Sequence, residues 1–330
     1  MTRALVTGAS GMLGRQLVDV LLAGGIAVRA FVRPSSDVRL LTSPPVEVLS
    51  GDLGDLDAIR RAVAGVNWVF HTAGYFNVGS PFDSSGSSPQ YKRVNVDLTE
   101  SLLTASLEAQ VERFLYVSSS SVYDSEADVP TGENAPLRPP SDYGRSKLQA
   151  EELVRSYQAK GLKGTIIRPC VMYGPGDRHF LPVALKLTRL PVLPLVNAGR
   201  NLFDLVYVRD VAELLLAAGR SDAAVGKAYN AGPGVPTSLR DLVEAYRLVT
   251  GRGPRIVPVS VEVVRFSARP SRWLLARLAP GAEAMLTDTG LALMSKDLHL
   301  DMSQARIDLD YQPRFSLEQG IAATLASFEM

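Results

Sequence analysis

Near its start the chain carries a glycine-rich turn, Thr7-Gly8-Ala9-Ser10-Gly11-Met12-Leu13-Gly14, between a short apolar run and a longer amphipathic one. The run Ala4–Thr7 predicts a buried strand, and Met12–Ala23 predicts a helix with its leucines on one face. Glycines at this spacing permit a tight turn, close approach of the backbone to a pyrophosphate and close packing of the helix on the strand. Free N–H groups at the helix start favour phosphate. The segment therefore predicts a dinucleotide-binding turn, with an unliganded glycine turn as the alternative.

Short apolar runs alternate with amphipathic stretches through the first two-thirds of the chain. Further strands are predicted at Ile26–Val32, Val46–Leu49, Trp68–His71, Arg113–Val117 and Thr165–Arg168. Further helices are predicted at Asp55–Ala64, Val94–Glu108 and Asp142–Lys160. This alternation predicts an α/β fold, a Rossmann-type doubly wound parallel sheet with helices on both faces.

The alternation weakens beyond about residue 170, where prolines become frequent. We therefore expect an NADP-binding type of Rossmann domain over residues 1–170 and a smaller C-terminal α/β substrate lobe over most of 171–330. Segments within about 200–230 would return to the Rossmann sheet, because short strands are predicted at Leu205–Val208 and Lys227–Asn230. The arginine-interrupted apolar stretch Val261–Leu278 could form a core-covering helix pair, line a substrate cavity or rest on a membrane surface.

Composition excludes several classes of protein. A formal net charge of +1 over 330 residues gives no field for nucleic acid. The single cysteine, Cys170, excludes internal disulfides, has the apolar flanks of a buried structural thiol, and fits a reducing, cytoplasmic compartment. His71, His179 and His299 are scattered, so no metal site is expected. No apolar run reaches the ~18 residues of a membrane span, and the early strand argues against a signal peptide.

The end of the second predicted strand distinguishes the two nicotinamide dinucleotides. A carboxylate at this position binds the ribose 2′-hydroxyl and favours NAD(H). This chain has Arg33 there, followed closely by Ser35 and Ser36. A guanidinium can pair with a 2′-phosphate in a forked geometry, whereas a carboxylate would repel it. We therefore expect NADP(H) to be preferred, with NAD(H) possible and a solvated surface arginine as the alternative interpretation.

Tyr143 and Lys147 lie four residues apart at the start of a predicted helix, and therefore on one face of it. A tyrosine pKa of about 10 is too high for a base at neutral pH, but a neighbouring ammonium favours the phenolate. The serine run Ser118–Ser121 ends the fifth predicted strand, at the edge where open α/β sheets bind ligands. A serine hydroxyl there can stabilise charge that develops on a substrate oxygen.

As a set, these motifs resemble the extended short-chain dehydrogenase/reductases of the NAD-dependent epimerase/dehydratase superfamily, over nearly the whole chain. The order of motifs matches from the glycine turn through Asp52-Leu53, His71-Thr72-Ala73-Gly74, Asn95, the serine run, Tyr143/Lys147 and Arg168-Pro169. The resemblance implies that Tyr143 is the acid/base and that Ser119 is the catalytic serine. Lys147 would hold the nicotinamide ribose and tune Tyr143, with Asn95 in support. Further cofactor contacts would come from Asp52, Leu53, Thr72, Ala73, Gly74, Pro169 and Val171.

Two branches of this family compete. Nucleotide-sugar epimerases and dehydratases carry an asparagine and an arginine as anchors for a sugar diphosphate, where this chain has Val171 and Phe203. Because a diphosphate needs charge-assisted partners, both departures weigh against a nucleotide sugar. The second half instead resembles the 3β-hydroxysteroid dehydrogenase branch, with dihydroflavonol reductases nearby, at residues 168–177, 199–204 and 300–313. The implied substrate contacts are Tyr75, Ser120, Met172, Phe180 and Phe203, with Val171 and Leu202 completing an apolar pocket.

The expected activity is NADP(H)-dependent hydride transfer to or from a hydroxyl or ketone of a hydrophobic small molecule, of steroid, flavonol or ketoacid type. Tyr143 would protonate the reacting oxygen and Ser119 would hold it. A nucleotide-sugar epimerase or dehydratase is the alternative, and a non-catalytic NADP-binding module is a second one. A homodimer is expected through Val94–Glu108 and Asp142–Lys160, the pair of helices through which the family often dimerises.

Overall fold

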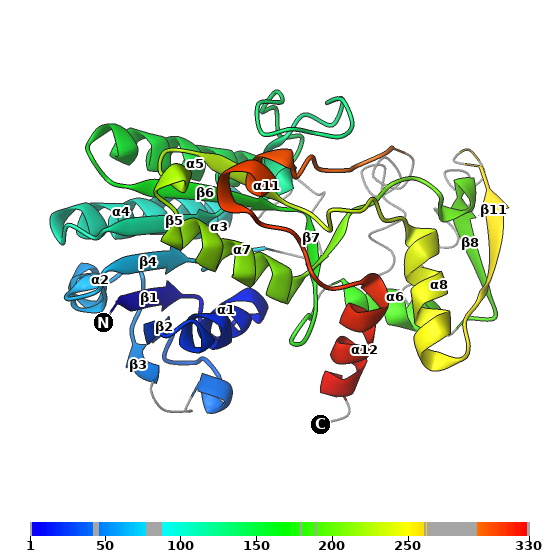
Figure 1. Ribbon diagram of the computed structural model, residues 1–330, viewed down its shortest axis with the longest axis horizontal. Helices are drawn as coiled ribbons and strands as arrows, with labels where there is room; N and C mark the ends of the chain where they lie inside the picture. The colour runs from blue at the N-terminus through cyan, green and yellow to red at the C-terminus, as the bar shows by residue number, and fades with distance from the viewer. Residues whose placement is uncertain are drawn as a thin grey trace.

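The computed structural model describes residues 2–41, 46–76, 88–178, 180–188, 190–260, 262 and 296–328. A seven-stranded parallel sheet forms its centre, in the order β10-β6-β5-β4-β1-β2-β3 (Figure 1). The strands are β1 (Arg3–Thr7), β2 (Ala27–Val32), β3 (Val46–Ser50), β4 (Trp68–His71), β5 (Arg113–Val117), β6 (Gly164–Pro169) and β10 (Ala228–Ala231). The predicted Rossmann-type fold is confirmed.

Helices cover both faces of this sheet. The helices α1 (Met12–Ala23) and α7 (Val208–Arg220) pack on one face. On the other face lie α2 (Leu56–Val63), α4 (Leu98–Glu108) and α5 (Asp142–Ala159). Leu5 and Val6 of β1 are both 0% exposed and enter opposite core clusters, because side chains alternate along a strand. Burial on both faces explains why the strands are continuously apolar rather than alternating.

One predicted helix differs from its observed form. The pattern at Val94–Glu108 suggested one regular helix, but the structure has a short α3 (Ser88–Tyr91), a π-helical stretch η2 (Lys92–Asp97) and then α4. The helical segment therefore begins earlier than predicted and contains a wider turn. Such turns often occur at functional positions.

Among the residues described, the second lobe contains two small parallel sheets and three helices. The strand β7 (Val171–Tyr173) pairs with β9 (Leu205–Tyr207), and β8 (Val192–Val196) pairs with β11 (Arg255–Val259). Its helices are α6 (Leu181–Thr188), α8 (Leu239–Thr250) and α12 (Leu317–Phe328). The helix α11 (Ser303–Leu309) packs instead on the main-sheet core, beside β10. Of the two late strands predicted, β9 thus joins the second lobe, whereas β10 completes the main sheet beside β6.

One stretch and one histidine singled out from the sequence lie outside the described residues. The stretch Val261–Leu278 lies outside the described residues apart from Glu262, and so does His179. Within the part of the chain that the structure describes, no helix has the length and apolar character needed to cross a membrane. Over the same residues, no group of three His, Cys, Asp or Glu side chains is arranged to hold a metal ion.

Candidate functional site

The residues predicted for the site gather at the carboxyl edge of the main sheet. Because all seven strands are parallel, the turns that follow β1, β4, β5 and β6 lie at the same edge. The chain runs from β1 through β2 to β3 on one side and then returns to β4 on the other side of β1. Ligands of open α/β sheets bind where the strand order reverses in this way.

The glycine turn after β1 is packed too closely for larger residues. Gly8 has a φ of +71°, and a Cβ on it would lie 2.7 Å from the backbone nitrogen of Ala73 in the turn after β4. A Cβ on Gly14 would lie 2.1 Å from the carbonyl oxygen of Gly8. Beside Gly11 a Cβ would meet only that carbonyl, at 3.2 Å. The turn therefore brings bare backbone to an open side, as a pyrophosphate requires.

Asn95 joins three segments of the site from the π-helical stretch η2. Its side chain is buried, and its Oδ1 accepts a hydrogen bond of 2.7 Å from the backbone N–H of Tyr75. Its Nδ2 donates to the Tyr75 carbonyl at 3.1 Å and to Ser146 Oγ, in α5, at 3.0 Å. Asn95 therefore fixes the chain after β4 against the helix that carries Tyr143.

His71 links the glycine turn to Asn95 through two buried hydroxyls. Its Nδ1 lies 2.7 Å from Thr7 Oγ1, and its Nε2 lies 2.9 Å from Thr99 Oγ1. The Thr99 hydroxyl donates its proton to the carbonyl oxygen of Asn95 at 2.8 Å. It must therefore accept from His71, which assigns the proton to Nε2 and makes Nδ1 an acceptor from Thr7.

This arrangement makes stability depend on pH, because burial, with the charge of Lys147, lowers the pKa of His71 from 6.5 to about 3. The unfolded chain binds a proton below about pH 6.5, whereas the folded chain resists it until about pH 3. We predict that this group alone removes about 2 kcal/mol of unfolding free energy between about pH 7 and pH 5. Urea unfolding of wild type and of His71→Gln at both pH values measures the difference.

Comparison at higher pH supplies the control for this prediction. Between about pH 7 and pH 8.5 both proteins should change in parallel, since His71 is neutral in the folded and unfolded states there. An equal loss of stability in the two proteins between pH 7 and pH 5 would show that His71 has no part in it.

Tyr143 lies in the first turn of α5, close to the serine turn after β5. Ser141 caps this helix, its Oγ accepting from the N–H of Gly144 at 3.1 Å. A Cβ on Gly144 would lie 2.2 Å from the carbonyl oxygen of Ser121, so only glycine permits this approach of helix and turn. Burial raises the pKa of Tyr143 from 10.0 to about 12, and a hydrogen bond with Ser119 opposes the shift.

Two aromatic residues that the sequence did not single out enclose Tyr143. The Phe76 ring meets the Tyr143 ring edge-on with centroids 4.9 Å apart, and the Tyr91 ring lies 5.9 Å away. Tyr91 is 2% exposed and also contacts Tyr75, at 5.3 Å between centroids. No spacing pattern connects these residues with Tyr143 because they come from different segments. Their rings contribute the apolar surroundings that raise the phenol pKa.

Lys147 contacts the end of β5. Its Nζ donates to the Val117 carbonyl at 2.6 Å and lies 4.5 Å from the centroid of the Tyr116 ring. Burial lowers the pKa of Lys147 from 10.5 to about 7, against an opposing effect of Glu151. The expectation that Lys147 lowers the pKa of Tyr143 is wrong for this structure, because burial dominates both groups.

Ser119 begins the short 3₁₀ turn η3 (Ser120–Val122), which contains the predicted substrate contact Ser120. The Ser119 Oγ accepts a hydrogen bond of 3.1 Å from the N–H of Ser121 and donates one of 3.1 Å to Ser121 Oγ. The neighbouring Ser118 Oγ is buried and has no hydrogen-bond partner in the described chain. A Cβ on Gly74 would be in van der Waals contact with Asn95 Oδ1 at 3.5 Å and with Lys147 Nζ at 3.8 Å, so the turn after β4 lies against the lysine. The orphaned hydroxyl beside these residues fits the hydroxyl-rich ribose of a nicotinamide dinucleotide.

A buried ion pair lies behind this carboxyl edge of the sheet. Arg168 and Glu151 are both 0% exposed and form two hydrogen bonds, Nε–Oε1 of 2.9 Å and Nη2–Oε2 of 2.7 Å. The guanidinium also donates to Tyr123 Oη and to the Glu133 carbonyl, each at 2.9 Å. Tyr123 donates in turn to Asn230 Oδ1 at 2.7 Å. The network ties α5 and β6 to β10.

The predicted adenine end of the site is exposed. Arg33 follows β2 on the surface, and its guanidinium has no hydrogen bond or ion pair among the residues described. Asp52 is exposed after β3, and its Oδ1 accepts from the N–H of Gly54 at 2.8 Å. Leu53 packs against the core between the main sheet and the helices α2, α4 and α5. The structure thus places these residues beyond the glycine turn, at neighbouring strand ends.

The predicted substrate residues divide between two clusters. Phe180 and Phe203 lie 5.9 Å apart between ring centroids and pack, with Val171, in the core of the second lobe. Met172 packs instead against the main-sheet core. Adjacent residues of β7 point to opposite faces, so Met172 does not share a wall with Val171 as the predicted pocket required. Pro169, the last residue of β6, is buried and is separated from Val171 by Cys170 alone.

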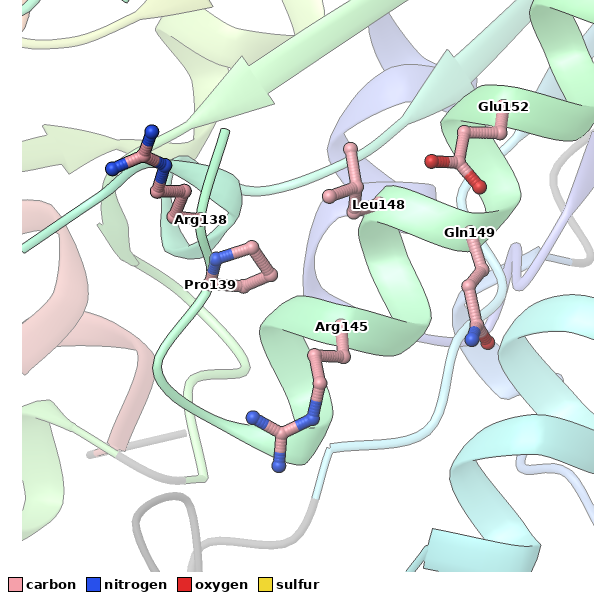
Figure 2. A pocket seen from close by; sticks show the side chains of 6 residues that line it. All are labelled: Arg138, Pro139, Arg145, Leu148, Gln149 and Glu152. Carbon is pink, nitrogen blue, oxygen red and sulfur yellow. The ribbon is translucent and has the colours of Figure 1, made fainter. Parts of the chain in front are cut away.

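A hollow of about 390 Å³ lies on the outer side of α5, away from the candidate site. It is lined by Arg138, Pro139, Arg145, Leu148, Gln149 and Glu152 (Figure 2). Arg145 lies two positions after Tyr143, and Gln149 lies two positions after Lys147. Residues two positions apart do not share a helix face. This hollow is separate from the predicted chemistry, and its lining combines charged and polar side chains with Pro139 and Leu148.

Comparison with known proteins extends these observations. A family model described as "NAD dependent epimerase/dehydratase family" matches residues 4–232. The chain is 30% identical over 325 residues to the "4-hydroxy-2-methyl-3-oxo-4-farnesyl-3,4-dihydroquinoline-1-oxide ketoreductase" of Stigmatella aurantiaca, covering 97% of this chain and 95% of that protein. It is 29% identical over 339 residues to the 3-beta-hydroxysteroid dehydrogenase of Mycolicibacterium neoaurum, covering 98% and 90%.

Solved structures also include close matches in fold. The structure "MoeE5 in complex with UDP-glucose and NAD" aligns with a TM-score of 0.76 and 28% identity, covering 99% of this chain and 98% of that one. The similarities thus include both a ketoreductase and a protein that holds a nucleotide sugar.

Proposed function

Because the chain belongs to the NAD dependent epimerase/dehydratase family, as its motifs predicted, we propose that it is an NADP(H)-dependent reductase of a ketone on a hydrophobic small molecule. The observation that carries this proposal is the meeting of Tyr143 and Ser119 at the carboxyl edge, next to an apolar lobe. The same proposal makes the enzyme an oxidoreductase that acts on CH–OH groups in the reverse direction.

NADPH, when bound, supplies the hydride for the carbonyl carbon. The glycine turn, Thr72–Gly74 and Lys147 would hold the dinucleotide, with Pro169 and Val171 beside its nicotinamide. Tyr143 would donate its phenol proton to the carbonyl oxygen. Ser119 would donate a hydrogen bond to the same oxygen and stabilise the charge that develops there. Asn95 would keep α5 in position for both contacts.

The pKa of Tyr143 supports the reductive direction. With a pKa of about 12, the phenol carries its proton at neutral pH and can donate it without prior activation. Oxidation of an alcohol would first require removal of that proton. The protonated phenol is therefore the form that reduction uses.

The second lobe supports an apolar substrate rather than a nucleotide sugar. Val171, Phe180 and Phe203 offer no charge-assisted partner to a diphosphate. The ketoreductase relative names a substrate with a farnesyl chain, which is consistent with such a lobe. A nucleotide-sugar epimerase or dehydratase is the second candidate, favoured by the solved structure that contains UDP-glucose.

A kinetic comparison tests this proposal. Oxidation of NADPH is followed by absorbance with a homologous series of 3-oxo compounds of increasing alkyl length. We expect kcat/KM to rise about fourfold for each methylene buried, since burial of one CH₂ is worth about 0.8 kcal/mol. Titration of the protein with UDP-glucose by calorimetry is the control. Tight binding of that ligand, together with no ketone-dependent oxidation, would favour the epimerase.

Two further expectations belong to this proposal. A cytoplasmic location agrees with the free Cys170, whose thiol pKa burial raises well above its usual value, as in an unreactive structural cysteine. A homodimer through α4 and α5 would have a polar interface, because Glu100, Glu108, Gln149 and Glu152 are exposed on these helices.

A further inference from the structure

Three arginines surround the loop that follows β2. Arg33 extends from the strand end, Arg39 begins the 3₁₀ turn η1 (Arg39–Leu41), and Arg15 reaches over from α1. Arg39 is engaged by Asp37, with its Nε 3.0 Å and its Nη2 2.8 Å from the carboxylate oxygens. The Arg39 guanidinium holds the pKa of Asp37 well below its usual range. This pair is neutral overall, so the net positive charge of the loop comes from Arg15 and Arg33.

The Arg15 guanidinium is poorly satisfied for a half-buried cation. Its Nε is buried and has no hydrogen-bond partner among the residues described, and its Nη2 lies 3.5 Å from the Asp37 carbonyl oxygen. That distance exceeds the usual N–H···O range of about 2.7–3.2 Å. Across the described ranges, no carboxylate lies within ion-pair distance of Arg15. A cation in such surroundings gains from any anion that binds beside it.

The position of Arg15 relates this cation to the dinucleotide turn. Arg15 directly follows Gly14, and its N–H donates to the Gly11 carbonyl at 3.0 Å in the first turn of α1. Its side chain points from that turn toward the loop after β2, where the adenosine ribose of a dinucleotide lies in such folds. Arg15 and Arg33 therefore approach the same loop from two elements.

We propose that Arg15 is a second cationic ligand of the NADP(H) 2′-phosphate, opposite Arg33. The assignment rests on the proposed use of NADP(H) and adds a specificity-determining residue on α1. A dianionic phosphate can accept hydrogen bonds from two guanidinium groups at once. Arg15 would then distinguish NADPH from NADH without contacting the rest of the dinucleotide.

Equilibrium binding of NADPH and of NADH, followed by nicotinamide fluorescence, tests this assignment without turnover. For Arg15→Met we expect the Kd for NADPH to rise about tenfold or more, with the Kd for NADH unchanged within about twofold. Arg15→Lys keeps the charge and should recover part of the loss. Arg209→Met, on α7, removes a charge from a half-buried ion pair with Glu213 and should alter neither Kd.

The outcomes separate this assignment from the proposed function. If Arg15 only held the loop against α1, Arg15→Met would weaken both dinucleotides by the same factor, and that result would overturn the assignment. A second outcome would also overturn the assignment. In it, wild type prefers NADPH and Arg33→Met loses the preference, but the ratio of the two Kd values in Arg15→Met equals that of wild type. Equal affinity of wild type for both dinucleotides would instead remove the proposed cofactor preference.

Discussion

Replacement of Tyr143 by phenylalanine should lower kcat for ketone reduction by about a thousandfold, within the range of about 10²–10⁴ that a positioned acid contributes. The substitution removes only the hydroxyl and leaves the ring between Phe76 and Tyr91. Without the phenol proton, the oxygen that gains charge must take its proton from water. KM and the Kd for NADPH should change little, because the lost contact forms mainly as the reaction proceeds.

Tyr157→Phe supplies a matched control on the same helix. Tyr157 is 7% exposed, and its hydroxyl bonds only to Thr104 Oγ1, at 2.6 Å, in the described chain. Tyr157→Phe also removes one phenol hydroxyl from α5, but at a position far along the helix from Tyr143. This variant should retain the kcat of wild type. Equal activities of Tyr143→Phe and wild type on a substrate that wild type turns over would show that Tyr143 is not the proton donor.

Replacement of Glu151 by glutamine should lower the free energy of unfolding by about 3–5 kcal/mol, because it leaves the buried charge of Arg168 without its anion. Both side chains are 0% exposed, so water cannot replace the carboxylate. The remaining partners of the guanidinium, Tyr123 and the Glu133 carbonyl, are uncharged acceptors. Urea unfolding of purified protein at pH 7 measures the loss.

Arg155 provides the comparison for this prediction. It also contacts Glu151, at 3.6 Å, but its side chain is 44% exposed. Arg155→Met should therefore cost at most about 1 kcal/mol, as exposed ion pairs do. The double variant Glu151→Met/Arg168→Met should recover part of the loss seen in Glu151→Gln, since it removes both charges. A cost below about 1 kcal/mol for Glu151→Gln would mean that the pair is not desolvated as described.

The central sheet and its ligand-binding edge could be predicted because each rests on a local pattern. Continuous apolar runs such as Ala4–Thr7 mark strands that are buried on both faces, and their alternation with helices requires a parallel sheet. Parallel strands in turn bring their carboxyl ends together. The placement of Ser119 and Gly8 at one edge followed without knowledge of any contact.

Other features depend on contacts that no local pattern records. The π-helical stretch around Asn95 arises from a shift of backbone hydrogen bonds, which residue composition does not specify. The pKa of Tyr143 depends on Phe76 and Tyr91, which approach it only in the folded chain. The family resemblance implied one pocket for Met172 and Val171, but alternation along β7 separates them. In each case the sequence indicated the residue itself but not the contacts that surround it in the folded chain.

The position of β10 has a consequence for how the protein is made. The outermost strand of the main sheet is residues 228–231, whereas its neighbour β6 ends at Pro169. During synthesis the ribosome must therefore add the whole of β7 through α7 before β6 gains its last partner. Until then β6 is an open edge, with backbone groups available to other chains. The chain is therefore most open to strand pairing with other chains during that interval, before β10 completes the sheet.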